Sequence, residues 1–312
     1  MTKVSVIGGA GFVGQIVAFG LTKSEVVNEV VLVDIIEDRP QGIALDMMES
    51  TPIFGSDTYV RGTNDYAEMS GSDIVVVTAG VPRKPGMDRM DLLKINVNIC
   101  KSVVTEIKNH CPNAMIIYVA NPVDVLTYAA MKVSGFNKNK VFGMAGVLDT
   151  ARYRSFIAME AKVSTKDILA MVLGGHGDSM VPLPRYTSIG GLPISNFLTN
   201  EKIEKIVERT RKGGGEIVSL LKTGSAYYAP GMAVAEMVEA IIKDQKRVLP
   251  VVAYLDNKYG FSDVYAGVPV ILGKNGVEKV IEIELNEEET DAYNKSINHV
   301  KLGIEDVKKL LN

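Results

Sequence analysis

The most constraining feature of the sequence is the alternation, through its first half, of short apolar runs with longer amphipathic segments. The runs are rich in Val and Ile, lack polar alternation, and occupy residues 4–7, 30–33, 74–79, 114–119 and 141–143. Such runs are typical of parallel strands that are buried on both faces. The segments between them, at 14–24, 41–49, 91–109 and 123–134, are long enough to form crossover helices. We therefore predict an α/β fold built on a doubly wound parallel sheet.

The second half of the chain follows a different pattern. Its strand-length runs, at 248–254, 268–272 and 277–283, are separated by Gly, Asp and Asn turns, which favours an antiparallel meander. A further strand is expected at 169–173, and helices are expected at 201–222, from after Pro230-Gly231 to about residue 243, and at 286–311. We expect a Rossmann-type domain over residues 1–146, followed without a flexible linker by an α+β substrate-binding domain over residues 147–312.

The composition of the chain indicates which binding partners and which cellular compartment to expect. The chain has 312 residues and a formal net charge of −3, so it has no basic excess that would attract nucleic acid or an anionic membrane. No apolar run reaches the roughly 20 residues of a membrane-spanning helix, and we expect no targeting segment before the first strand. The two cysteines, Cys100 and Cys111, form no CxxC pair. We therefore expect reduced thiols in a cytoplasmic protein, and no metal site.

Residues 9–14 form a glycine-rich turn between the first predicted strand and helix. Gly9, Gly11 and Gly14 fit the pattern G-x-G-x-x-G, in which glycine lets the backbone approach a pyrophosphate at a helix N-terminus. Asp34 follows the next predicted strand, where a carboxylate can accept hydrogen bonds from both ribose hydroxyls. The same carboxylate would repel a 2′-phosphate, and no arginine follows directly, so the pattern favours NAD over NADP as the cofactor.

A second glycine pattern overlaps the first. Gly8, Gly11 and Gly14 also fit G-x-x-G-x-x-G, which is typical of short-chain dehydrogenases. Those enzymes use a Tyr-x-x-x-Lys pair, and Tyr254 and Lys258 have that spacing. Because this pair lies in the predicted meander, far beyond the parallel sheet, we interpret it as coincidental.

Among the histidines, His176 is the strongest candidate for acid–base chemistry. It lies between Gly175 and Gly177, just after a predicted strand, where flanking glycines indicate a backbone that closely approaches a ligand. Imidazole titrates near neutrality, so it could exchange the hydroxyl proton when an alcohol is oxidised by hydride transfer. Asp149 and Arg152 would share one face of a helix. The carboxylate could orient the imidazole and the guanidinium could bind a substrate carboxylate, although the pair alone would equally fit a surface ion pair.

Two further segments follow predicted strands at the edge where α/β sheets bind ligands. The segment 80–89 contains two prolines, two glycines, Arg83 and Arg89. We interpret it as a lid that carries guanidinium groups into the site, since arginine binds carboxylates in a bidentate way; an exposed basic loop is the alternative. Asn121 follows the strand at 114–119, where its amide could contact the substrate oxygen and the nicotinamide ribose.

In order and spacing, these motifs resemble those of the lactate/malate dehydrogenase family, and the resemblance covers essentially the whole chain. The matching residues are Gly9-x-Gly11-x-x-Gly14, Asp34, Arg83 to Arg89, Asn121-Pro122, Leu148-Asp149-x-x-Arg152 and Gly174-Gly175-His176-Gly177. The resemblance implies arginine at position 83 in the enzymes that act on malate and glutamine in those that act on lactate. It therefore implies an NAD-dependent oxidoreductase that interconverts malate and oxaloacetate, a reaction of the tricarboxylic acid cycle.

The resemblance also implies a role for each of the catalytic and substrate-binding residues. His176 would exchange the proton, oriented by Asp149. Arg152 would hold the C1 carboxylate of the substrate, and Arg89 would polarise the reacting carbonyl. Arg83 would bind the distal carboxylate, which malate has and lactate lacks.

Further roles that the resemblance implies concern the cofactor, the pocket and the assembly. Asn121 would contact both substrate and cofactor, and Asn96 and Val119 would contribute on the cofactor side. Ser225 and Ala226 would leave room beside the distal carboxylate. The resemblance also implies a homodimer or homotetramer.

Two alternative functions stay open. The first is a lactate or other 2-hydroxyacid dehydrogenase, in which a buried Arg83 would lack a partner beside the methyl group of pyruvate. The second is a non-catalytic nucleotide-binding protein on the same fold, which would not require His176, Asp149 and Arg152 together.

Overall fold

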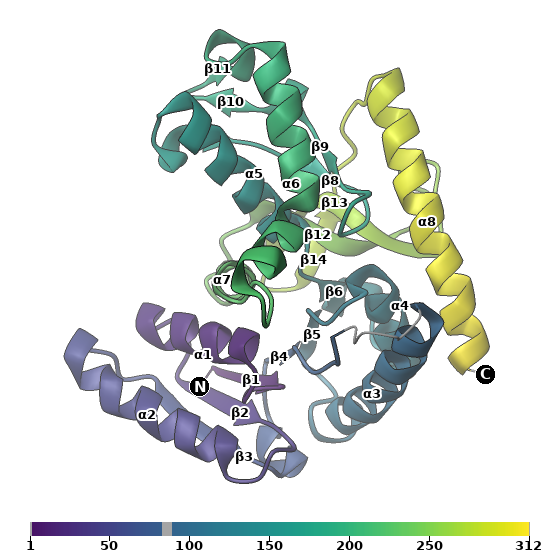
Figure 1. The fold of residues 1–312 in the computed structure, drawn as a ribbon. Coiled ribbons are helices and arrows are strands. Elements are labelled where there is room, and N and C mark those ends of the chain that lie inside the picture. The colour runs from purple at the N-terminus through teal and green to yellow at the C-terminus, as the bar shows by residue number, and fades with distance from the viewer. Residues whose placement is uncertain (1, 83–88, 312) are drawn as a thin grey trace.

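The centre of the molecule is one continuous sheet. The computed structural model describes residues 2–82 and 89–311, and within them nine strands pair in the order β14-β13-β12-β6-β5-β4-β1-β2-β3 (Figure 1). The parallel part comprises β1 (Lys3–Ile7), β2 (Glu29–Val33), β3 (Tyr59–Thr63), β4 (Ile74–Val77), β5 (Met115–Tyr118) and β6 (Val141–Gly143). The strand order reverses between β1 and β4, which opens a crevice at their carboxyl ends. The predicted doubly wound sheet is confirmed.

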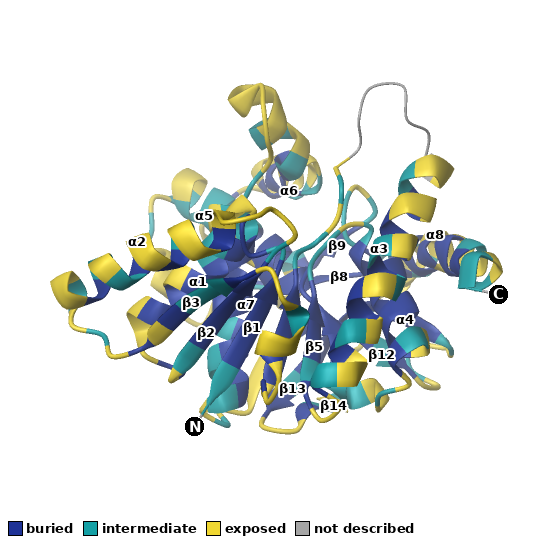
Figure 2. Cartoon of the chain, turned by 90° about the horizontal axis from the view of Figure 1, so that it is seen from below, coloured by how far each residue is buried: buried dark blue, intermediate teal, exposed yellow. Residues whose placement is uncertain are grey.

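Helices cover both faces of this sheet. They are α1 (Phe12–Ser24), α2 (Arg39–Phe54), α3 (Arg89–His110), α4 (Val123–Ser134), α7 (Tyr228–Ile242) and α8 (Glu287–Leu311). Their contacts separate two groups, because α1 packs against α2 and α7, whereas α3 and α4 pack against each other and against α8. Figure 2 shows the buried strands in the middle and the exposed outer faces of the helices around them. The strands β1, β2 and β4 are therefore buried on both faces, as their unbroken apolar runs predict.

The sequence pattern does not predict β3, the strand at the edge of the sheet. Its sequence, YVRGT, contains no apolar run, and Val60 and Thr63 are its buried residues. The Arg61 guanidinium instead pairs with Glu29 on β2, with Nε 2.6 Å from Oε1. An edge strand is covered on fewer sides than a central one, so it does not need the apolar composition by which the other strands are identified.

The antiparallel meander extends the same sheet. It consists of β12 (Arg247–Leu255), β13 (Val264–Gly273) and β14 (Gly276–Val280). β12 pairs antiparallel with β6 through Val252 and Gly143. The meander was predicted as part of a second domain, and its strands form as expected, but they share a sheet with the first half. The boundary at residues 146 and 147 stays a prediction.

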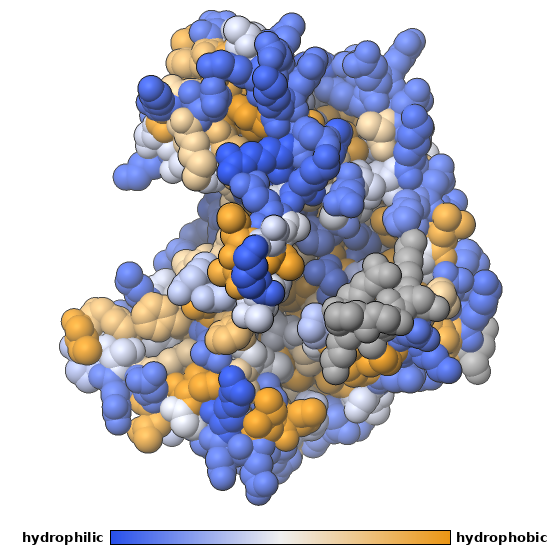
Figure 3. All heavy atoms as spheres, in the orientation of Figure 1, coloured by the Kyte–Doolittle hydropathy of each residue, from blue (hydrophilic) through white to orange (hydrophobic). Residues whose placement is uncertain are grey.

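The remaining elements of the second half form a smaller layer. They are α5 (Gly146–Ala161), α6 (Asn200–Leu221), and the two-residue strands β7 (Ile168–Leu169), β8 (Val172–Leu173), β9 (Val181–Pro182), β10 (Ser188–Ile189) and β11 (Leu192–Pro193). The strand expected at 169–173 is thus split between β7 and β8, which belong to different small sheets. This layer has its own apolar cluster, with Tyr153, Ile157 and Ile206 among its members. In the space-filling view the surface is hollowed between this layer and the part that contains α1 and α2 (Figure 3).

Short 3-10 turns complete the structure, at Tyr66–Met69, Lys138–Lys140, Thr165–Asp167, Pro184–Tyr186 and Ile194–Asn196.

Candidate active site

The glycine-rich turn joins β1 to α1 and has no room for side chains at Gly8, Gly9 and Gly14. Gly8 has a φ of +84°, a conformation that L side chains rarely adopt. A Cβ on Gly14 would lie 2.5 Å from Gly8 O, and a Cβ on Gly9 would lie 2.9 Å from Leu32 Cα on β2. Gly11 caps α1 at its N-terminus. The backbone of the turn is therefore the surface that faces a ligand, and the helix presents unpaired N–H groups to it.

Asp34, directly after β2, binds the backbone of this turn through its carboxylate. The Ala10 N–H donates to Asp34 Oδ2 at 2.9 Å, and the Ile36 N–H donates to Oδ1 at 3.1 Å. Each carboxylate oxygen can accept a further hydrogen bond. The half-buried carboxylate is therefore held rigidly, with acceptor capacity left for a pair of hydroxyl groups.

A cavity of about 510 Å³ lies beside the turn and Asp34. Its walls come from the carboxyl ends of β1 and β4 and from α3, and they include the apolar side chains of Ile35, Tyr66, Ile99 and Val103. Apolar walls with one fixed carboxylate and an exposed backbone turn suit the adenosine half and the pyrophosphate of NAD. The residues present therefore fit this cofactor.

Asn96 links the two strand ends on the other side of the crevice. It is 1% exposed, and its Nδ2 donates to Val81 O at 3.2 Å and to Asn121 O at 2.9 Å, while its Oδ1 accepts from the Val81 N–H at 2.9 Å. Both amide hydrogens are thus used within the protein. Val119 continues β5, donating its N–H to Val77 O at 2.9 Å. Asn96 positions the loops after β4 and β5, and direct contacts of these residues with the cofactor stay a prediction.

The loop that carries His176 is anchored to three distant elements. The backbone N–H groups of residues 174, 175 and 176 donate to Gly267 O on β13 at 2.9 Å, to Ser296 Oγ on α8 at 2.8 Å and to Asp124 Oδ2 on α4 at 2.9 Å. Three consecutive bonded amides leave this backbone little freedom. The imidazole is therefore presented from a rigid support at the carboxyl edge of the sheet.

His176, Asp149 and Arg152 form one cluster, as the sequence predicts. His176 Nδ1 lies 2.9 Å from Asp149 Oδ2, and Arg152 Nη1 donates to Asp149 Oδ1 at 3.3 Å. The side chains of Asp149 and Arg152 are 3% and 9% exposed, and that of His176 is 20% exposed. Because Nδ1 is held by Asp149, Nε2 is the ring nitrogen that can exchange a proton with a ligand.

The charges around His176 favour its protonated form. Burial acts to lower the pKa of His176, but the adjacent Asp149 carboxylate, together with Asp124, outweighs burial and raises the pKa above its usual value. Burial also raises the pKa of Asp124 itself to about 6. Among the described residues, Asp124 Oδ1 has no hydrogen-bond partner.

Asp124 was missed by sequence reasoning. Its one sequence signal is its position, three residues after Asn121 and in the first turn of α4, where an acidic residue also fits a helix N-terminus. Its partner His176 is 52 residues away, so the contact cannot be inferred from local spacing.

Several predicted site residues are not placed by the structure. Arg83 lies outside the described residues, and for Arg89 only the backbone is described, as the first residue of α3. Ser225 and Ala226 lie in the connection between α6 and α7. Their roles toward the substrate stay predictions.

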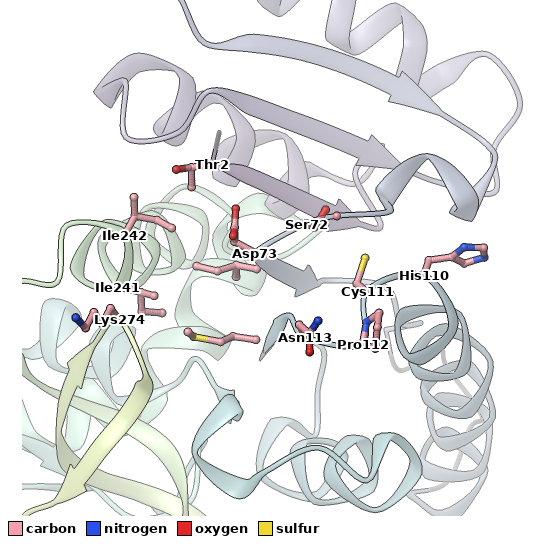
Figure 4. Close-up of a pocket in the computed structure, with 13 residues that line it drawn as sticks. Thr2, Ser72, Asp73, His110, Cys111, Pro112, Asn113, Ile241, Ile242 and Lys274 are labelled. Carbon is pink, nitrogen blue, oxygen red and sulfur yellow. The ribbon is translucent and has the colours of Figure 1, made fainter.

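A second cavity, of about 430 Å³, lies at the opposite edge of the sheet. Figure 4 shows Thr2, Asp73 and Asn113, each just before a strand of the parallel sheet, around this cavity. The ring of His110 points away from them, with Nε2 3.4 Å from Glu106 on its own helix. Burial raises the pKa of the nearby Cys111 thiol, which disfavours the reactive thiolate. This cavity is therefore lined neither by the glycine-rich turn and Asp34 nor by His176.

Within residues 2–82 and 89–311, no helix is both long and apolar enough to cross a membrane, and no group of three or more His, Cys, Asp or Glu side chains is arranged to hold a metal ion.

Comparison with curated proteins gives full-length relatives. The chain is 56% identical over 308 residues to the malate dehydrogenase of Roseiflexus sp. (strain RS-1), covering 99% of both chains. It is also 56% identical over 301 residues to the malate dehydrogenase of Anoxybacillus flavithermus, covering 96% of both chains.

Solved structures are similar over the same length. The malate dehydrogenase from Salinibacter ruber is 52% identical, with a TM-score of 0.95 over 99% of this chain and 98% of that one. The lactate dehydrogenase from Cryptosporidium parvum in complex with lactic acid and NAD is 46% identical, with a TM-score of 0.94 over 98% of both chains. The fold alone therefore does not separate the two substrate types.

Two family models together match nearly the whole chain. The NAD-binding domain of lactate/malate dehydrogenase matches residues 2–143, and the α/β C-terminal domain of the same family matches residues 146–311. The predicted cofactor, NAD, is thereby confirmed. With both domains matched and full-length relatives at more than half identity, the chain belongs to the lactate/malate dehydrogenase family.

Proposed function

We propose that this chain is an NAD-dependent malate dehydrogenase, which reversibly oxidises (S)-malate to oxaloacetate. The observation that carries the proposal is the cluster of His176, Asp149 and Arg152 at the same sheet edge as the NAD crevice. It provides a proton acceptor, a group that orients it and a guanidinium for a carboxylate. The full-length relatives named malate dehydrogenase support the choice of substrate.

In this reaction the cluster exchanges the hydroxyl proton and binds the C1 carboxylate of the substrate. The chemistry that NAD would supply when bound is hydride acceptance. His176 Nε2 takes the hydroxyl proton as the carbonyl forms, and returns it in the reverse direction. Asp149 holds Nδ1 and stabilises the resulting imidazolium, as in other His–Asp pairs. Arg152 binds the C1 carboxylate, Arg89 stabilises the negative charge that develops on the reacting oxygen, and Asn121 contacts substrate and cofactor.

Arg83 is the residue that would separate malate from lactate. Oxaloacetate carries a distal carboxylate that pyruvate lacks, and closure of the segment 80–89 over the site would place the guanidinium against it. With pyruvate the guanidinium would be buried without a counter-charge, at a cost on the order of 3–5 kcal/mol if fully buried. A discrimination of roughly a hundredfold or more follows, since each ~1.4 kcal/mol is tenfold in rate.

The test is NADH oxidation with oxaloacetate and with pyruvate by the wild-type chain and by Arg83→Gln. We expect the wild type to prefer oxaloacetate by roughly a hundredfold or more in kcat/KM, and Arg83→Gln to lower that ratio steeply while NADH affinity stays unchanged. Arg152→Gln is the matched control, because it should impair both substrates alike. A ratio that Arg83→Gln leaves unchanged would exclude Arg83 as the specificity residue, and a wild type that prefers pyruvate would favour the lactate alternative.

We further propose a cytoplasmic homodimer or homotetramer that serves the tricarboxylic acid cycle and divides into the two domains 1–146 and 147–312. An assembly is supported by a groove of about 420 Å³ between α1, α5 and α7. Met232, which lines this groove, is 51% exposed. Large apolar side chains on α1 and α2, such as Phe19 and Ile53, are also exposed, and such patches commonly mark interfaces. Light scattering on the purified chain distinguishes monomer, dimer and tetramer.

A further inference from the structure

Helix α6 contains three consecutive glycines in its interior, Gly213, Gly214 and Gly215. Each glycine in a helix interior lowers helix stability by roughly 1 kcal/mol relative to alanine. Three in a row therefore call for a reason outside the helix itself. The three positions differ sharply in what surrounds them.

Gly213 is in direct contact with the substrate-binding arginine. A Cβ at this position would lie 2.3 Å from Arg152 Cδ and 2.7 Å from Arg152 Nε. A Cβ on Gly214 or on Gly215 would have no neighbour within 4 Å. Gly213 is buried, so the stem of Arg152 runs across the bare backbone of α6 at this one residue.

The Arg152 side chain has little room to avoid an added methyl group. It is 9% exposed, it is covered by α6 on one side, and its guanidinium is tied to Asp149. A Cβ at 2.3 Å requires movement of the Cγ–Cδ–Nε stem, and any such movement is carried to the guanidinium at its end. Misplacing a substrate-binding group by about 1 Å can reduce turnover by roughly 100-fold.

We propose that Gly213 is a positioning residue for the substrate carboxylate: its missing side chain sets the path of Arg152 across α6 and thereby aims the guanidinium into the site. This inference rests on the proposed function, in which Arg152 binds the C1 carboxylate. It assigns α6 a part in substrate binding, although Gly213 itself does not touch the substrate.

The test compares Gly213→Ala with Gly214→Ala. Both changes replace a helical glycine by the best helix former, so both favour α6 equally, but only the first adds a methyl group against Arg152. We expect Gly213→Ala to raise KM for oxaloacetate about tenfold or more, to weaken any turnover of pyruvate as well, and to leave the Kd for NADH within about twofold. Gly214→Ala should keep wild-type kinetics. Equal kinetics of the two variants would overturn the proposal.

A double-mutant cycle keeps the test decisive if Gly213→Ala folds poorly. Arg152→Ala removes the atoms that the new Cβ would meet, so the double variant should fold where Gly213→Ala alone does not. Its KM should differ from that of the Arg152→Ala single variant by less than about twofold. Independent effects that multiply in the double variant would contradict the proposed contact. The proposed function is tested separately, because it requires only that the wild type turns over oxaloacetate.

Discussion

The NAD crevice and the histidine cluster lie at the same edge of one sheet, but they are built in different ways. The crevice is made mainly of backbone and apolar walls, with Asp34 as its fixed carboxylate, and the contact between Asp34 and Ala10 spans 24 residues. The cluster gathers charged side chains from separate elements. Its loop bonds to Asp124 and Ser296 across 52 and 121 residues.

The NAD crevice therefore depends mainly on the shape of the backbone, and the histidine cluster depends mainly on buried charges. In the crevice, a side chain at Gly9 would collide with Leu32 on β2, and one at Gly14 would collide with the backbone at Gly8, so the tight turn requires glycine at both positions. In the cluster, the buried groups Asp149, Asp124 and Arg152 set the protonation of His176, and buried charge opposes folding. We therefore expect changes in the cluster to affect catalysis without affecting cofactor binding, and changes at the crevice to do the reverse.

The largest effect on turnover is expected from replacing the imidazole of His176. His176→Asn keeps a polar side chain of similar size but removes the group that exchanges the proton. Turnover of oxaloacetate should fall by roughly 10²–10⁴-fold, while NADH binding, measured by fluorescence titration, should stay close to wild type. A parallel loss of NADH affinity would show that the two regions are not separable in this way.

The pH dependence of the wild type should carry the signature of the same group. Reduction of oxaloacetate needs protonated His176 and oxidation of malate needs the neutral form, so the two rates should respond oppositely to pH. Because Asp149 and Asp124 raise the pKa of His176, reduction should persist to a higher pH than an unperturbed imidazole would allow. Profiles of kcat/KM in the two directions measure this directly.

An intermediate effect is expected from Asp124→Asn, which should raise the stability of the fold but impair the reaction. Its pKa is raised from 3.8 to about 6 by burial, so the folded state binds this proton more tightly than the unfolded state. The resulting destabilisation is absent below about pH 4, grows as the pH rises through about 6, and amounts to on the order of 3 kcal/mol above that. Asp124→Asn keeps an oxygen for the His176 N–H, and should therefore be more stable than wild type in urea unfolding at pH 8, with a smaller gain at pH 5.

The same substitution should impair the reaction. Without the Asp124 charge, the pKa of His176 falls, so oxaloacetate reduction by Asp124→Asn should be lost at a lower pH than in wild type. Asp263→Asn provides a control of opposite sign, because Lys308 and Tyr128 help to lower the pKa of Asp263, and its loss should decrease stability above pH 4. An Asp124→Asn variant less stable than wild type at pH 8 would contradict the assignment of a buried, unfavourable charge.

The two regions also differ in how far the sequence predicts them. The strands β1, β2, β4, β5 and β6 and the glycine-rich turn follow from local patterns, because each pattern expresses a constraint within a few residues. Two features do not follow from local patterns. The edge strand β3 has no apolar run in its sequence YVRGT. The junction of β12 with β6 pairs Val252 with Gly143, which are far apart in the sequence.

In the cluster, the sequence identifies the chemistry but not all of its support. His176, Asp149 and Arg152 are predictable from residue type and from helical spacing. Asp124, Ser296 and Gly213 are not, because each acts through a partner that only the folded chain brings near. Positioning residues of this kind are defined by tertiary contacts rather than by a motif.

The smallest effect on activity is expected from a change at Asp34, the carboxylate that lines the NAD crevice. Asp34→Ser removes an acceptor for the ribose diol and the repulsion of a 2′-phosphate, so NAD affinity should fall about tenfold and the bias against NADP should shrink. Serine also leaves one of the two N–H groups of Ala10 and Ile36 without its present acceptor, which loosens the turn. The measurement is kcat/KM for both cofactors at saturating oxaloacetate, together with the pH profile of oxaloacetate reduction.

The pH profile of Asp34→Ser should keep its wild-type midpoint, because Asp34 is not among the charges that shift the pKa of His176. A displaced midpoint would mean that the two regions are electrostatically coupled, and equal use of both cofactors by the wild type would remove Asp34 as the selecting residue.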